Sequence, residues 1–449
     1  MLSPSSRRIR GRYGLVACGV VVGLIWAQSA WAQSTAQIPL QFDFMNPGAR
    51  SLGMGGAFVG GADDASAAYA NPAGLTQIMT KEFSVEGRFR SVDTTFLRGG
   101  RVSGVVTGVG ADVIAGPSYG TDRDRHTSPA FLSLVMPVGH VTVAAYRHEA
   151  VGIENSFFSE GPFERATFGG VTDDNNRDLP LGGTRKMAIA NYGGAIGVRL
   201  SDRLAFGGGL SLYTFHLDSD FARFSFQSNI FSPVDRNAIT ATAVQSGDDV
   251  SWGANAGVLW TVSPKVAVGA QFRRGPRFGF TQEDRVPIND LDLVRSGKFK
   301  VPDVLGAGVQ WRASSSLRVL ADYDWVRYGQ LKEDFITIQS LSTGRQAQLF
   351  IDDGHEVHGG VEYLVLTLAK PLALRAGVWV DPDHAVRYEP TAANDSVDVL
   401  LSATLPGGKT LTHYTFGAGV ALSNRSELNA GIDVSSRSTY LTASGVIRF

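Results

Sequence analysis

Residues 49–75 read ARSLGMGGAFVGGADDASAAYANPAGL, and this stretch decides how the rest of the chain is interpreted. It consists mainly of glycine and alanine, carries one acidic pair (Asp63 and Asp64), and ends in Asn71-Pro72-Ala73-Gly74. Neither the period of a strand nor that of a helix runs through it, and its glycine content disfavours a stable helix. The stretch therefore needs walls that other parts of the chain supply.

The same residues resemble the N-terminal plug of the FadL/TodX family of outer-membrane transporters for hydrophobic compounds. In that family a glycine-rich run with an Ala-Phe pair and an Asp-Ala-Ser triplet leads into Asn-Pro-Ala-Gly. The matching positions here are Gly53, Gly56, Ala57, Phe58, Gly60, Ala62, Asp64, Ala65, Ser66, Asn71, Pro72, Ala73 and Gly74. The resemblance implies that residues 33–80 form a plug, or hatch, inside a β-barrel made by residues 81–449. A disordered linker is the alternative, but the large apolar side chains of this stretch argue against it.

The first residues have the features of a secretory signal. Arginines at 7, 8, 10 and 12 precede an apolar run, and Ala30-Trp31-Ala32 fits a cleavage site, so we expect residues 1–32 to be a signal peptide. Twin-arginine export and lipidation at Cys18 are the alternatives. Because Cys18 is the only cysteine, the mature chain would contain no disulfide, thiolate metal site or cysteine nucleophile.

The composition excludes two other classes of protein. With 41 basic and 42 acidic residues, the net charge is −1, so no basic face for nucleic acid is indicated. No segment of the mature chain is apolar for eighteen or more residues, which argues against an α-helical membrane protein.

From residue 81 onward, apolar and polar residues alternate in segments of strand length. Between Leu317 and Trp325, for example, the odd positions are apolar, whereas Arg318, Asp322 and Asp324 lie between them. We expect fourteen such strands, near residues 81–92, 127–137, 139–150, 186–200, 203–218, 249–262, 265–282, 298–312, 316–328, 354–367, 371–381, 412–422, 426–434 and 439–449.

The connections between these strands alternate between short and long. Short turns follow the even-numbered strands, and long polar loops follow most odd-numbered ones, at 93–126, 151–185, 219–248, 283–297, 329–353 and 382–411. This asymmetry is typical of outer-membrane barrels. The fold class is therefore all-β, a 14-stranded antiparallel transmembrane β-barrel with an N-terminal lumenal plug. A soluble sandwich or propeller is the alternative, but it would not need long loops on one side only.

Charged residues on the inward face line the barrel interior in this interpretation. They are Glu86, Arg88, Arg90, Arg147, Arg199, Arg273, Arg318, Asp322, Asp324, Glu362, Arg375, Asp433 and Arg448. We expect Asp63 and Asp64 of the plug to pair with some of these arginines. Aromatic residues near strand ends, among them Tyr323 and Tyr328, are expected to form girdles at the membrane surface.

Two further sites are suggested in the loops. The loop at 219–248 is unusually apolar, and in the resembled family the corresponding loop helps to form an outer site that captures ligand. Its candidate capture residues are Phe221, Phe224, Phe226, Ile230 and Phe231, although packing between loops explains them equally well. The family also releases ligand sideways through a break in strand three, for which Gly152, just beyond the third expected strand, is the candidate.

The sequence contains no recognisable catalytic set, metal site or cofactor motif. No Ser-His-Asp set can be placed in it, and His355 and His358 would face opposite sides of a strand, so they cannot converge on one ion. By resemblance we expect a monomeric channel in the outer membrane of a Gram-negative bacterium for passive uptake of hydrophobic molecules, such as long-chain fatty acids or aromatic hydrocarbons. Its expected partners are that ligand, outer-membrane lipids and, through the C-terminal Phe449, the barrel assembly machinery. The alternatives are a FadL-like barrel that serves a secretion system as a protein-binding shuttle, and a hydrophilic porin.

Overall fold

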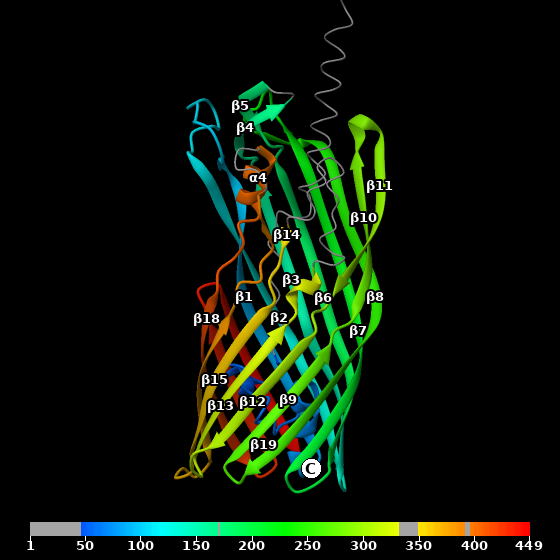
Figure 1. Cartoon of the computed structure of the whole chain (residues 1–449), viewed down its shortest axis with the longest axis vertical. Coiled ribbons are helices and arrows are strands. Elements are labelled where there is room, and N and C mark those ends of the chain that lie inside the picture. The colour runs from blue at the N-terminus through cyan, green and yellow to red at the C-terminus, as the bar shows by residue number, and fades with distance from the viewer. Residues whose placement is uncertain (1–45, 169–170, 332–348, 391–395) are drawn as a thin grey trace, which may run out of the picture.

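Antiparallel strands form a wall that closes on its own first strand (Figure 1). The structure is a computed structural model that describes residues 46–168, 171–331, 349–390 and 396–449. The described wall strands are β1 (Glu82–Arg101), β2 (Gly116–Val138), β3 (Val141–Ser159), β6 (Leu181–Arg199), β7 (Leu204–Phe226), β8 (Val234–Ser263), β9 (Val266–Arg274), β12 (Val304–Arg312), β13 (Leu317–Val326), β15 (Gly354–Val365), β16 (Leu372–Asp381), β18 (Leu411–Ser423), β19 (Ser426–Val434) and β20 (Ser438–Arg448). Each pairs with the next, and β20 pairs with β1 from Arg448–Glu82 to Ser438–Val92. The predicted 14-stranded barrel is therefore confirmed.

The two ends of the barrel differ as predicted, but the strands are longer than expected. Short turns lie at one end, whereas at the other end β1, β2, β3, β6, β7 and β8 extend far beyond the apolar band (Figure 1). The expected loops at 93–126, 151–185 and 219–248 are thus largely strand. These extensions escaped prediction because their exposed faces carry polar residues, such as His216, Asp218 and Asp220 of β7, so the sequence there lacks a regular apolar outer side.

The long-hairpin end carries the remaining elements. β10 (Arg277–Val286) and β11 (Leu291–Lys300) form a hairpin around η2 (Pro287–Asn289), where a loop was expected at 283–297. β4 (Phe163–Phe168) and β5 (Val171–Arg177) form another hairpin. β14 (Leu349–Phe350) pairs with β17 (Arg387–Tyr388), near α4 (Ser396–Thr404) and η3 (Tyr328–Leu331).

Alternation places apolar side chains on the outer face of the wall. Trp252 and Trp260 are more than half exposed on β8, whereas Asn255 between them is buried inside. Two of the predicted orientations are wrong. Arg147 points outward, because its neighbours Tyr146 and His148 are the buried residues, and Tyr328 lies inside the barrel, stacked on His384 at 3.9 Å between ring centroids.

The described N-terminal segment, residues 46–80, lies inside the barrel near the short-turn end (Figure 1). It contains α2 (Ala49–Leu52), α3 (Ala67–Ala70) and η1 (Pro72–Gln77), and most of its side chains are buried. The expected signal peptide and residues 33–45 fall outside the described residues. Within the described chain, no helix combines the length and the apolar character that crossing a membrane requires.

Candidate functional site

The Asn71-Pro72-Ala73-Gly74 turn anchors the N-terminal segment to the wall. The Asn71 side chain donates from Nδ2 to the carbonyl oxygens of Val59 (2.9 Å) and Val258 (3.1 Å), and its Oδ1 accepts from the amide of Ala73 (3.2 Å). Pro72 begins the short helix η1, where its missing N–H costs nothing. The turn thus binds the segment to itself and to β8 through one side chain.

Glycines in the wall form the recess that receives the segment. A Cβ atom added at Gly53 would lie 2.9 Å from Cα of Gly417 on β18, and one added at Gly360 on β15 would lie 2.2 Å from the carbonyl oxygen of Met54. Side chains at these positions would push the two backbones apart. The wall glycines in close contact with the segment are Gly197, Gly207, Gly257, Gly269, Gly308, Gly360, Gly377, Gly417 and Gly431.

Wall side chains also hold the segment through its backbone. Asp322 accepts hydrogen bonds from the amides of Phe58 and Val59, the latter at 2.6 Å. Asn255 donates from Nδ2 to the carbonyl oxygens of Ala68 (2.9 Å) and Tyr69 (3.0 Å). The segment is therefore fixed on two sides of the barrel.

An ion-pair network joins the acidic pair to the wall. Asp63 pairs with Arg318 of β13 at 2.8 Å and with Arg50 of the segment, while Glu362 of β15 accepts from Arg50 at 3.0 Å and from Arg375 at 2.8 Å. Burial opposes the charge on Asp63, but the guanidinium groups of Arg50 and Arg318 hold its pKa below the ordinary value. The expected pairing with a wall arginine is therefore present for Asp63.

Asp64 behaves differently from its neighbour. Among the described residues its carboxylate has only a distant cation, Arg50 at 3.7 Å, and it accepts from the amide (2.9 Å) and hydroxyl (2.6 Å) of Ser66. Burial raises the pKa of Asp64. The expected contact with a wall arginine is therefore absent for this residue in the described chain.

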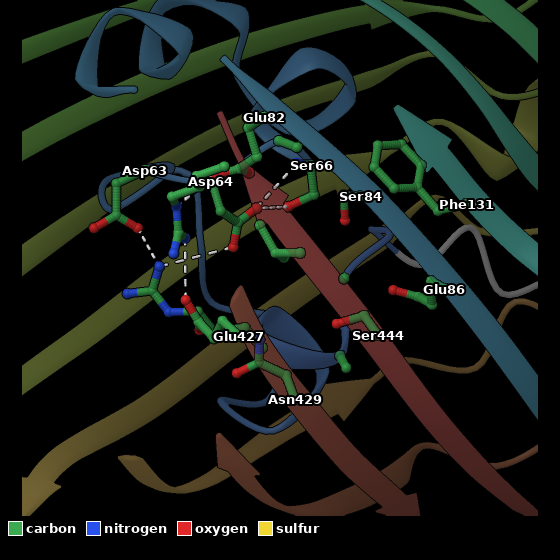
Figure 2. Close-up of a pocket in the computed structure, with 16 residues that line it drawn as sticks. Asp63, Asp64, Ser66, Glu82, Ser84, Glu86, Phe131, Glu427, Asn429 and Ser444 are labelled. Carbon is green, nitrogen blue, oxygen red and sulfur yellow. Dashed lines mark hydrogen bonds and ion pairs between the residues drawn. The ribbon is translucent and has the colours of Figure 1, made fainter. Parts of the chain in front are cut away.

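A small polar cavity remains between the segment and strands β1, β19 and β20, where the barrel closes. Figure 2 shows Asp64 and Ser66 of the segment facing Glu82 and Glu86 of β1, with Glu427 and Asn429 of β19 nearby. It offers about 50 Å³ to the centres of water molecules, enough for a few waters. The cavity is too small and too polar to pass a hydrophobic molecule through this end.

An apolar cluster lies in the interior above the segment. Phe215 of β7 stacks on Phe278 of β10 and Phe299 of β11, with ring centroids 4.8 and 5.8 Å away. We call the set around them the lumenal cluster. It comprises Val151, Met187, Ile189, Tyr213, Phe215, Leu217, Phe278, Phe280, Phe299, Val301, Val304, Val326, Tyr328 and Leu331. A hydrophilic porin would instead line its bore with polar groups.

The wall is interrupted between β2 and β3. Their ladder runs only from Val138–Val141 to Phe131–His148, although β2 continues beside β1 and β3 continues beside β6. Irregularities in both strands lie at this point, because the register shifts around Ala130 in the β1–β2 ladder and around Ala150 in the β3–β6 ladder. With a rise of about 3.4 Å per residue and a strand tilt of about 40°, the ladder ends roughly 18 Å above the β2–β3 turn. An outer-membrane barrel has an apolar band about 25 Å tall, so the interruption begins within that band.

Side chains cap the backbone groups that the missing ladder leaves open. Asp122 accepts from the amide of Ser156 (3.1 Å) and from Asn155 Nδ2 (3.2 Å), and Asp124 accepts from the amide of Glu154 (3.3 Å). At the lower end, Arg147 donates to the carbonyl oxygen of Pro129. The interruption is a built feature of the wall in which side chains replace main-chain pairing.

The lumenal cluster reaches this interruption. Val151 of β3 belongs to the cluster, and the partly buried Ala150 and Ile153 pack against it. Gly152, the predicted break residue, lies between them; it is part of β3 rather than beyond it, two residues from the register shift. An apolar interior thus borders the stretch of β3 that lacks a partner in β2.

The candidate capture residues divide into two groups. Phe221 is buried with Phe157, Leu181 and Ala243 inside the barrel. The others lie near the turn at 227–233 and are partly buried: Phe224 packs on Phe158, Phe226 lies beneath Arg177, Phe231 stacks on Phe163, and Ile230 accepts a hydrogen bond from Arg177. Their role in capture stays a prediction.

Two features of the site escaped sequence analysis. The lumenal cluster combines residues from seven strands, from η3 and from the connection after β11. Tyr213, Phe215 and Leu217 alternate with polar residues, but nothing local in the sequence shows which residues of the other strands they meet. An exposed apolar surface also lies in the β1–β2 connection, where Val105 is 75% exposed and Val109, Val113 and Ile114 are about half exposed. This connection had been interpreted only as polar loop.

Comparisons with known proteins agree with this geometry. The sequence model of the family described as outer membrane protein transport protein (OMPP1/FadL/TodX) matches residues 34–434. No curated protein matches the chain. A solved FadL homologue of Pseudomonas aeruginosa is 14% identical, with a TM-score of 0.62 over 90% of this chain and 99% of that chain. The toluene transporter TodX of P. putida is 16% identical (TM-score 0.57, 91% and 99% covered), and the toluene transporter TbuX of Ralstonia pickettii is 15% identical (0.55, 91% and 99%).

Proposed function

The chain belongs to the outer membrane protein transport family (OMPP1/FadL/TodX), and from this premise we propose that it conducts hydrophobic molecules passively into the outer membrane. The substrates are small or extended apolar molecules, of the class of aromatic hydrocarbons or long-chain fatty acids. Solved proteins of similar fold include toluene transporters. In this proposal residues 33–80 act as a plug that blocks the axial path.

The observation that carries the proposal is the contact between the lumenal cluster and the interrupted wall. Val151 belongs to both, because it lines the interior on the stretch of β3 that lacks its partner strand. A hydrophobic molecule in the cluster therefore reaches lipid sideways without crossing the polar cavity beneath the plug. Its release needs no energy source, because transfer from the aqueous exterior to lipid is downhill for apolar surface.

A disulfide across the interruption tests this route. Cysteines in place of Ser128 and Glu149, whose side chains meet at 2.5 Å just above the end of the ladder, would join β2 to β3, and the mature chain would contain no competing thiol. We expect oxidation to abolish uptake of a radiolabelled hydrocarbon or fatty acid into cells, and reduction to restore it. The control pair replaces Leu134 and Ala145, which face each other within the intact ladder, and should transport normally in both states.

Uptake that survives the oxidised Ser128–Glu149 staple would exclude lateral release. Mass spectrometry of the purified barrel separates the remaining function, a protein-binding shuttle, from transport. Retained apolar molecules that are lost on polar substitution of Phe215 favour transport. A protein that co-purifies through the long-hairpin end, in the absence of any retained molecule, favours the shuttle.

A further inference from the structure

Three metal-ligating side chains converge inside the barrel, beside the N-terminal segment. Asp324 of β13 and Glu356 of β15 are direct partners in the antiparallel ladder, and His358 lies two residues further along the same face of β15. One ligand atom of each lies within 4.8 Å of the other two. Together with Gly55 and Gly56 of the segment they line a cavity that offers about 30 Å³ to the centres of water molecules.

A different neighbour holds each of these side chains by the atom that faces away from the others. Gln271 donates to Asp324 Oδ1 at 3.2 Å, and Tyr328 donates to Glu356 Oε1 at 3.3 Å. His358 Nδ1 lies 2.7 Å from the carbonyl oxygen of Gly55, so Nδ1 carries the hydrogen. Outer partners of this kind orient the ligands of metal sites and fix the histidine tautomer.

This tautomer leaves His358 Nε2 as a bare nitrogen directed at the two carboxylates. It has no hydrogen-bond partner among the described residues, lies 3.5 Å from Glu356 Oε2, and belongs to a side chain that is more than nine-tenths buried. A buried imidazole nitrogen that accepts no hydrogen bond destabilises the folded state, and a metal ion bound to that nitrogen would remove this cost.

We propose that Asp324, Glu356 and His358 bind one divalent transition-metal ion of the Zn²⁺ class, with water in the fourth position. One imidazole and two carboxylates form a ligand set suited to Zn²⁺, and the cavity leaves room for that water. Arg273 is the nearby cation, but its guanidinium donates to Asn46 at 2.6 Å and lies over the Tyr69 ring at 4.6 Å. Asp322 on the same face is occupied by the amides of Phe58 and Val59.

The ion would stabilise the seat of the N-terminal segment. A metal bound at Nε2 fixes the His358 ring, and that ring donates through Nδ1 to Gly55. A metal that binds the folded state alone also raises the free energy of unfolding, and above the Kd this gain grows with the logarithm of the metal concentration. The site therefore couples the wall to the segment, whatever molecule the barrel conducts.

Isothermal titration of the full chain in detergent tests the site, after removal of metal with a chelator. We expect one Zn²⁺ per barrel, and a loss of affinity of at least about tenfold for Asp324→Asn, Glu356→Gln and His358→Gln. The matched control is His355→Gln on the same strand, because His355 faces outward and meets Tyr323 instead. Circular dichroism verifies that each variant is folded, and three variants guard against the failure of any one.

X-ray absorption at the zinc edge supplies a second readout. We expect one nitrogen neighbour at about 2.0–2.1 Å and carboxylate oxygens at about 2.0–2.2 Å. The absence of stoichiometric binding, or equal affinity in His355→Gln and in all three ligand variants, would overturn the proposal. In that case a protonated His358 balances the carboxylates without a metal.

Discussion

Two sides of this barrel differ in how their neighbouring strands pair. On the closed side, made by β12, β13, β15, β16 and β18, the ladders run without a register shift. The wall there offers glycines and charged side chains to the N-terminal segment. On the open side, between β2 and β3, the ladder stops at Phe131–His148. Beyond this point, side chains make the contacts between the two strands in place of backbone hydrogen bonds.

In the proposed route, this difference separates the side of the barrel that holds the N-terminal segment from the side that releases the ligand. Where backbone groups of neighbouring strands hydrogen-bond to one another, the inward side chains can hold the N-terminal segment. Where main-chain pairing is withdrawn, weaker and separable side-chain contacts close the wall, and these can open at low cost. Apolar residues lie behind the open side, and ion pairs lie behind the closed side.

We expect the largest loss of stability on replacing Glu362, the carboxylate at the centre of the ion pairs on the closed side. Glu362→Gln removes the negative charge that Arg50 and Arg375 share in a buried site, which should cost about 3–5 kcal/mol of unfolding free energy. Urea unfolding of the folded barrel in detergent measures this cost. The control, Asp292→Asn, breaks an exposed pair with Arg285 and should change stability by less than about 1 kcal/mol. Equal effects would show that the network does not hold the segment.

A bulky residue in the glycine recess should have the next largest effect. Gly360→Val places its side chain against the carbonyl of Met54, which we expect to cost about 1–3 kcal/mol and to raise ion conductance in planar bilayers. Its neighbour Gly359 is the control, because a Cβ there meets only the Val378 carbonyl oxygen at 3.9 Å. Unchanged conductance in Gly360→Val would mean that the segment does not block the bore.

The acidic pair provides a finer test of the closed side. Asp63→Asn should increase leakage of small solutes into liposomes more than Asp64→Asn, because only Asp63 pairs with Arg318 of the wall. Asp63→Asn should lower the free energy of unfolding by about 2 kcal/mol, as expected when a buried charge loses its partner. A larger effect at Asp64 would contradict the assignment.

On the open side, removal of a backbone cap should have a smaller effect on stability. Asp122→Ala leaves the amide of Ser156 without its acceptor, which we expect to cost about 1 kcal/mol. Hydrogen exchange measured by mass spectrometry should quicken in residues 149–159 and stay unchanged in residues 141–148. Uniform exchange along β3 in the native chain would instead indicate that β2 and β3 pair throughout.

The smallest effect on stability is expected at the candidate capture surface. Phe224→Asp and Phe226→Asp should lower uptake a few-fold at low ligand concentration without reducing the yield of folded barrel. Val113→Asp provides the comparison, because Val113 is 58% exposed in the β1–β2 connection, whereas Phe224 packs on Phe158. A fall in folded yield for the phenylalanine variants would assign them to packing between the loops.

Much of the architecture was readable from local sequence patterns. Alternation between Leu317 and Trp325 places Asp322 and Asp324 inside, and the structure agrees. The short turns and the Asn71-Pro72 turn were equally legible, because turn chemistry depends on a few neighbouring residues. No metal site was predicted from the sequence, because Asp324 stands on another strand than Glu356 and His358.

The sequence by itself determined the number of strands, the face of most side chains and the identity of the N-terminal motif, because each depends on residues within a few positions of one another. Only the tertiary structure decided which wall glycines receive that motif, where the β2–β3 ladder ends, and which residues of seven strands meet in the lumenal cluster. These features depend on register between strands. A shift of one residue, such as that at Ala150, moves every following side chain to the other face, and no local pattern records it.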